Sequence, residues 1–144
     1  MRRRAILITV ATILAGTCQP AAGHDGADDH PSNDVEVLQP PAPVYPALAA
    51  ALGAEGYCEV RFSLHNYGKQ MSVDGLTCSH QIFCKAAFDG MMASRFKITD
   101  VPGAPIPGAR DSIVYPLEFA MEDGDGFDRD GAEMINCLAP GAIM

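Results

Sequence analysis

One run of alternating residues constrains this chain more than any other feature. Between residues 57 and 64, in YCEVRFSL, apolar side chains occupy every second position and alternate with polar or amphipathic ones. This two-residue period is typical of a strand with one buried face. The next four residues, HNYG, include Asn and Gly, which tolerate the positive φ of tight turns, and the apolar alternation resumes at Met71 and Val73. We therefore predict a β-hairpin over residues 55–73 whose dry face the rest of the chain covers.

Two helical patterns flank this hairpin. Residues 47–52, ALAAAL, are strong helix formers, and Gly53 ends them. After the hairpin, Ser79 can cap a helix that starts near residue 81. Apolar residues then recur at helical spacing and predict that this second helix packs on the sheet: Cys84, Ala87, Phe88 and Met91.

A third strand is predicted at residues 112–121, after a Pro- and Gly-rich loop at residues 97–110. Pro116 cannot donate a ladder hydrogen bond, which places this strand at a sheet edge. The helix reverses the chain between the second strand, at about residues 70–77 with a bulge at Gly75, and the third, so these two run parallel. The predicted fold class is α+β, in β-β-α-β order. It has a three-stranded antiparallel/mixed sheet of strand order 2-1-3, one helix packed on one face, and a short preceding helix.

The first 23 residues have the organisation of a cleaved signal peptide. Arg2, Arg3 and Arg4 precede an apolar run that is interrupted from Thr17 onward, well short of the ~20 apolar residues that a transmembrane helix needs. Small residues at 21–23 offer a cleavage site. We therefore expect an exported protein, with a lipid anchor at Cys18 as the less favoured alternative, because Thr17 fits the lipidation pattern poorly.

Charge divides the remainder into three parts. Removal of the leader takes three of the ten basic residues and leaves 18 acidic ones, a net charge of 7 − 18 = −11, which disfavours nucleic acid and anionic lipid as partners. We predict an acidic flexible lead-in at residues 24–41, a nearly neutral domain at residues 42–122, and an acidic tail at residues 123–144.

Residues that resemble metal or catalytic groups have simpler explanations. A calcium-loop reading of the tail fails, since Gly126 would fall at the first ligand position and Cys137 at that of the bidentate Glu. His65 and His80 lie in different loops, and no nucleophile, base and carboxylate occur together, so we predict no catalytic residue, metal or cofactor. The lead-in could gather several groups around a cation, but a solvated acidic segment is favoured: His24, Asp25, Asp28, Asp29 and His30.

An ordered set of short motifs resembles the C-terminal domain of the energy transducer TonB. The resemblance covers about residues 41–121, and no single motif is specific by itself. The matching residues are Pro43-Val44-Tyr45-Pro46, Glu55-Gly56, Gly68, Phe83, Ala86-Ala87-Phe88, Arg95-Phe96 and Val114-Tyr115-Pro116-Leu117-Glu118-Phe119. Two departures are Ser94, where relatives often carry tryptophan, and Ile98, where a proline often follows the phenylalanine, so the end of the helix is expected to pack differently.

The resemblance implies a periplasmic module that has no chemistry of its own. Such domains bind extended segments of outer-membrane transporters as an added strand, a mode that suits the predicted edge. The implied partner-binding residues are Ser112, Ile113, Val114, Tyr115, Pro116, Leu117, Glu118 and Phe119. Self-pairing through this edge would give a homodimer. A full transducer also has a membrane anchor and a proline-rich spacer, and this chain is expected to have neither, so the alternative is a disulfide-stabilised structural or accessory envelope protein that keeps the fold without transporter binding.

The four cysteines beyond the leader are interpreted through the same resemblance. Some relatives carry cysteines in the first strand and at the end of the second, as Cys58 and Cys78 do, and folding the hairpin brings these two opposite each other. Cys84 and Cys137 can then form a second disulfide that ties the tail to the helix. A Cys78–Cys84 bridge that leaves Cys137 free stays open, and a zinc site with His80 is disfavoured in an oxidising compartment.

Overall fold

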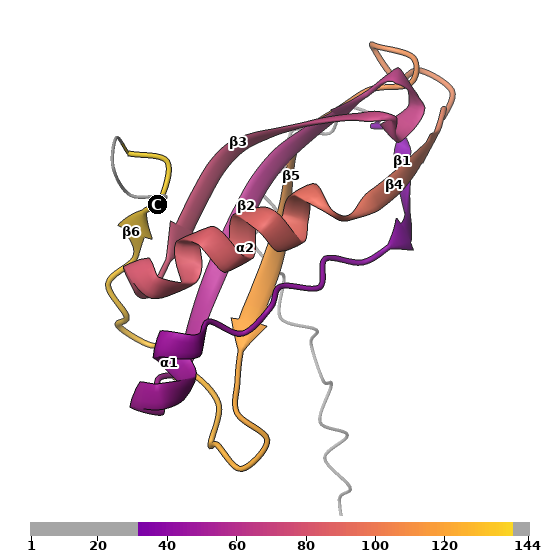
Figure 1. Ribbon diagram of the computed structural model, residues 1–144. Helices are drawn as coiled ribbons and strands as arrows, with labels where there is room; N and C mark the ends of the chain where they lie inside the picture. Colours follow the sequence, from indigo (N-terminus) through magenta and orange to yellow (C-terminus); the bar gives the residue numbers. More distant parts are fainter. Residues whose placement is uncertain (1–31, 140–144) are drawn as a thin grey trace, which may run out of the picture.

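Two antiparallel sheets and one main helix form the α+β fold of residues 32–139, the part of the chain that the computed structural model describes (Figure 1). The larger sheet has the order β5-β2-β3-β6, and the smaller one pairs β1 with β4. The predicted signal peptide, Cys18 and the lead-in residues 24–31 lie outside the described residues. The elements are β1 (Asp34–Gln39), α1 (Ala47–Leu52), β2 (Gly56–His65), η1 (Asn66–Gly68), β3 (Gln70–Cys78), η2 (Gln81–Phe83), α2 (Cys84–Met92), β4 (Arg95–Thr99), β5 (Arg110–Phe119) and β6 (Ile135–Asn136).

The predicted hairpin is the centre of the larger sheet. β2 and β3 pair antiparallel, and the turn between them has positive φ at Asn66, Tyr67 and Gly68. Gly68 is doubly constrained, because a side chain there would also collide with the backbone of Phe96. The register shifts opposite Gly75, which confirms the predicted bulge.

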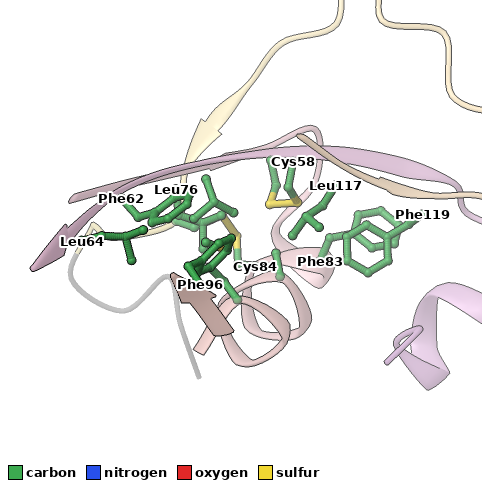
Figure 2. Close-up of a cluster of buried hydrophobic side chains, with 14 of the residues drawn as sticks. Cys58, Phe62, Leu64, Leu76, Phe83, Cys84, Phe96, Leu117 and Phe119 are labelled. Carbon is green, nitrogen blue, oxygen red and sulfur yellow. A yellow bond between two sulfur atoms is a disulfide. The ribbon is translucent and has the colours of Figure 1, made fainter. Parts of the chain in front are cut away.

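The core lies between this sheet and α2 (Figure 2). The alternating residues of β2 point into it and are fully buried, as are Cys84, Ala87 and Met91 on the inner face of α2. Aromatic rings close the core where the chain enters β2: Phe83 stacks on Phe119 at 4.7 Å between centroids. Each such buried aromatic side chain contributes about 2–3 kcal/mol of hydrophobic free energy, and this contact packs η2, directly before α2, against the end of β5.

The predicted fold is right in class and in central topology but wrong in the extent of the sheet. β5, β2 and β3 are neighbours in the order expected, with β5 antiparallel to β2. The larger sheet nevertheless has a fourth strand, β6, and β1 and β4 form a second sheet. None of these three strands was predicted.

The unpredicted strands are short or polar, so their local patterns are weak. β1 has the sequence DVEVLQ, lies in the segment predicted to be a flexible lead-in, and is mostly exposed. β4 has only five residues, although Phe96 and Ile98 alternate into the core, and it begins two residues before the predicted loop. β6 has two residues in the predicted tail. Each depends on a distant partner rather than on its own sequence.

The helices begin and end close to where the sequence predicted. Gly53 ends α1 in the left-handed conformation, at φ 63°. The predicted capping role of Ser79 is wrong, because its hydroxyl accepts a hydrogen bond from the Tyr57 N–H, and His80 caps the 3-10 turn that leads into α2. Among the described residues, no helix has the length and apolar character needed to cross a membrane.

Candidate functional site at the edge of the sheet

β5 lies at one edge of the larger sheet, as predicted from Pro116. Its inner side pairs with β2 along almost its whole length, and no strand within residues 32–139 pairs with its outer side. Figure 1 shows β5 beside β2, on the side away from β3 and β6. The residues predicted to bind a partner, Ser112 to Phe119, therefore all lie on this edge strand.

The hydrogen-bond pattern of β2 shows which backbone groups of β5 face outward. The Ser79 N–H donates to the Tyr57 carbonyl at 2.8 Å, so the backbone of Tyr57 faces β3. Successive residues of an antiparallel strand bond to opposite sides, so the backbone of Cys58 faces β5, where Leu117 is its partner. Leu117 thus bonds inward, and the backbone groups of its two neighbours, Pro116 and Glu118, face the free side.

Pro116 occupies the middle of the free side. By the same alternation Val114 also faces outward, so the edge offers N–H donors at Val114 and Glu118 and carbonyl acceptors at all three positions. Because Pro116 has no backbone N–H, an incoming strand can make one hydrogen bond fewer along this edge. Such a proline is a common protection of an edge against uncontrolled pairing.

A bulge at the start of β5 limits the usable length of this edge. The register between β2 and β5 shifts between Phe62 and Leu64, and Ser112 has a positive φ of 55°. The Ser112 N–H donates to the Ser63 hydroxyl at 3.4 Å instead of to a ladder carbonyl. Regular strand geometry is therefore available from Ile113 to Phe119. The sequence contained no local signal for this bulge, because serine is found in strands and turns alike.

The side chains of β5 separate a buried face from an exposed one. Leu117 and Phe119 are buried, and Ile113 and Tyr115 are half-buried against the core. On the other face Val114 is 51% exposed, and Pro116 and Glu118 are also exposed. An added strand could therefore contact Val114 and Glu118 without disturbing the core.

The described part of the acidic tail, residues 123–139, crosses the outer face of the sheet and does not pair with the edge of β5. The Met121 N–H donates to Glu55 Oε1 at 2.8 Å, and the chain then turns toward β3, where β6 pairs with Thr77 and Cys78. On the way, the guanidinium of Arg129 lies 4.0 Å above the Tyr57 ring.

The outer face under the tail is a small polar cluster that sequence reasoning missed. Arg129 Nη2 donates to Glu118 Oε2 at 3.3 Å, and the Tyr57 hydroxyl donates to Glu59 Oε1 at 3.0 Å. Burial, followed by the hydrogen bond and the charge of Glu59, raises the pKa of Tyr57, so its hydroxyl stays protonated and acts as a donor. The sequence signal that could have indicated this cluster is Arg129, the one basic residue in the otherwise acidic tail.

Two disulfides hold the domain together. Cys58 and Cys78 are directly opposite each other across β2 and β3, with Cα atoms 4.1 Å apart. Cys84, at the start of α2, is bonded to Cys137, directly after β6, with Cα atoms 5.5 Å apart. The open alternative, a Cys78–Cys84 bridge, does not occur in the structure. The second disulfide fixes Cys137, and with it the adjoining β6, against the start of α2.

The cysteine sulfurs are close together but are not metal ligands in this state. The sulfurs of Cys78, Cys84 and Cys137 lie within 4.8 Å of one another and are buried. A zinc site needs thiolates, and all three sulfurs are in disulfide bonds. Ser79 and His80 are engaged in the backbone hydrogen bonds described above. These four cysteines are therefore structural, and the candidate functional site is the unpaired edge of β5.

A small α+β sheet that presents one regular strand edge is typical of protein-interaction domains. The chain belongs to the family described as Gram-negative bacterial TonB protein C-terminal, whose model matches residues 41–119, more than half of the sequence. Domains of this family are non-enzymatic, periplasmic in Gram-negative bacteria, and interact with outer-membrane proteins. The predicted family is thereby confirmed. A comparison with curated proteins finds no match.

Proposed function

We propose that this protein is a periplasmic, non-enzymatic binding module that docks an extended segment of an outer-membrane transporter as an added strand along β5. The free side of Ile113–Phe119, with its outward donors at Val114 and Glu118, is the single observation that carries this function. The module would take part in TonB-dependent transport as the receptor-contacting partner. We further propose that residues 1–23 direct it to the periplasm and are removed there.

The segments outside the family match support the choice of β5. β1 and β6 both lie outside residues 41–119, and each adds a strand to the matched part: β1 covers β4, and β6 covers the end of β3. The described part of the chain adds nothing to the outer side of β5. A regular edge that the described chain leaves free along its whole length is an expected location for a partner strand.

The test is site-specific cross-linking in the periplasm. A photo-reactive side chain at Val114, which is exposed beside the free edge, is compared with one at Lys85, which is exposed on α2. We expect transporters to be cross-linked from position 114 and not from position 85, and the second substitution Glu118→Pro to reduce that yield. Equal labelling from both positions, or none from position 114, contradicts docking at β5.

Pro116 is the observation that favours the second candidate, a disulfide-held structural or accessory envelope protein. The missing donor weakens an incoming strand by roughly one hydrogen bond, ~1 kcal/mol. In this case position 114 labels only envelope-scaffold proteins or a second copy of the chain. Sedimentation of the purified protein separates the last two, since pairing through β5 would give a dimer.

A further inference from the structure

A groove at the opposite end of the sheet has features of a second binding site. It has a volume of about 700 Å³ and lies between the start of β3, the start of β4 and the end of α2. In Figure 1 these elements meet at the hairpin end of the molecule, away from α1. Its lining includes four apolar side chains that are at least partly exposed and no acidic residue: Leu38, Met71, Met92 and Ala93. Methionine side chains adapt to varied apolar partners.

Two basic residues line the same groove. Lys69 and Arg95 are exposed, and neither forms an ion pair with any acidic residue of the described chain. Two other basic residues of the described chain form ion pairs instead, Lys97 with Glu36 and Lys85 with Asp89. In a chain with a formal net charge of −8, an acidic ligand is repelled from most of the surface and attracted here.

The groove also borders an unpaired stretch of backbone. β6 pairs only with Thr77 and Cys78, so within the described chain no strand pairs with the outer side of β3 from Gln70 to Gly75. Gln70 and Met71 are at once part of this edge and part of the groove lining. Main-chain hydrogen bonds, apolar contacts and ion pairs are therefore available side by side.

We propose that this groove is a second docking site, which binds an extended acidic segment of a partner protein. Carboxylates of the segment pair with Lys69 and Arg95, and an apolar side chain between them packs on Met71 and Met92. This site is independent of docking at β5, because β3 and β5 lie on opposite sides of β2. The protein would then connect two partners through one sheet.

A structural role for the two cations is the competing explanation. α2 ends at Met92, and positive charge near the C-terminus of a helix stabilises it. That role would change the stability of the free protein, whereas docking would change affinity for a peptide. Measuring both for the same variants separates the two.

The test uses the disulfide-bonded protein from residue 24 onward and a fluorescein-labelled peptide, Glu-Leu-Glu-Val-Glu-Leu. A peptide with Lys in place of each Glu is the control. We expect the acidic peptide to bind at low ionic strength, more weakly as salt increases, and to shift the amide resonances of residues 69–71 and 92–96 rather than 113–119. Lys69→Gln and Arg95→Gln should each weaken binding about five- to tenfold, with Arg95→Lys retaining most of the affinity. Lys85→Gln should leave it unchanged.

Four results overturn this proposal. Equal binding of the basic peptide removes the charge argument, and shifts confined to residues 113–119 assign the peptide to β5 instead. Loss of stability without loss of affinity in the Lys69 and Arg95 variants assigns these cations to the helix end. Full displacement of the peptide by laurate would make a small anionic amphiphile the occupant. Val114→Pro should not change the affinity for this peptide. A peptide that does not bind at the groove therefore does not contradict the proposed docking at β5.

Discussion

The two edges of the larger sheet are closed to different degrees. Over Thr77 and Cys78 the β3 edge is paired with β6, and the Cys137 N–H donates to the Leu76 carbonyl. A disulfide from Cys137 to α2 then fixes that pairing covalently. Within residues 32–139 the β5 edge is interrupted by a bulge and by Pro116 but is paired with no strand. Sheet edges pair with other chains unless something prevents it, so the difference indicates that the described chain closes the Cys78 end of β3 and keeps β5 and the start of β3 available.

Removal of the Cys84–Cys137 disulfide should have the largest effect. Its two residues are 53 positions apart, and the Cys84→Ala, Cys137→Ala variant should lose about 2–5 kcal/mol of unfolding free energy. β6 should then separate from β3, because two residues cannot hold a strand in place. Urea unfolding measures the first effect, and hydrogen exchange of the backbone N–H at position 137, which is bonded to the Leu76 carbonyl in the native chain, measures the second.

The matched variant removes the other disulfide. Cys58 and Cys78 are 20 positions apart, so their replacement by Ala should cost about 1 kcal/mol less on chain-entropy grounds. β6 should stay paired, since its own disulfide remains. If both double variants expose the β3 edge equally, the comparison between a covalently closed edge and an open one does not hold.

Substitutions along β5 should change binding more than stability. Val114→Pro removes an outward N–H that has no partner within the described chain, so transporter affinity should fall about five- to tenfold while unfolding free energy changes little. Pro116→Val restores a donor and should raise affinity about fivefold. Calorimetric titration with the captured transporter segment measures the affinity of each variant. A large loss of stability in either variant would mean that the outer side of β5 is already occupied.

Arg129 tests the contact between the tail and the outer face. Arg129→Gln removes the cation above Tyr57 and the ion pair with Glu118, both partly exposed, and should cost about 0.5–1 kcal/mol. Urea unfolding measures this loss. Affinity at β5 should stay within twofold, because the tail crosses the face of the sheet and not its edge. A tenfold change in affinity would instead make the tail part of the docking site.

Alkaline pH should produce the smallest effect. The pKa of Tyr57 and that of Tyr45 are raised from 10.0, mainly by burial, so above about pH 10 the unfolded chain loses protons that the folded one keeps. The tyrosine contribution to stability is therefore complete below pH 10 and declines as pH rises through the folded pKa. Urea unfolding at pH 9 and pH 10.5 measures this decline, which Tyr57→Phe should reduce. An unchanged decline in that variant would assign the effect to Tyr45.

Much of the central fold was predictable because its residues alternate strongly. In β2 the alternating residues from Cys58 to Leu64 are fully buried, so the period specified both the strand and its inner face, although Tyr57 and Ser63 on the other face are also buried. The edge position of β5 followed from one residue, Pro116, since a proline cannot donate to a neighbouring strand. The docking residues were named from the family resemblance, with which this edge position agrees, and their role as a binding site remains our proposal.

By itself, the sequence determined the hairpin, the helix that covers it, the neighbour order of β5, β2 and β3, and the family. The first three depend on residue periodicity and turn chemistry, which act over a few neighbouring positions, and the family depends on the ordered set of short motifs. Only the tertiary structure decided that the lead-in forms β1, that the tail forms β6, and that Lys69 and Arg95 share a groove. Such short or polar segments gain their free energy from partners far along the chain, and local pattern contains no information about which distant partner is within reach.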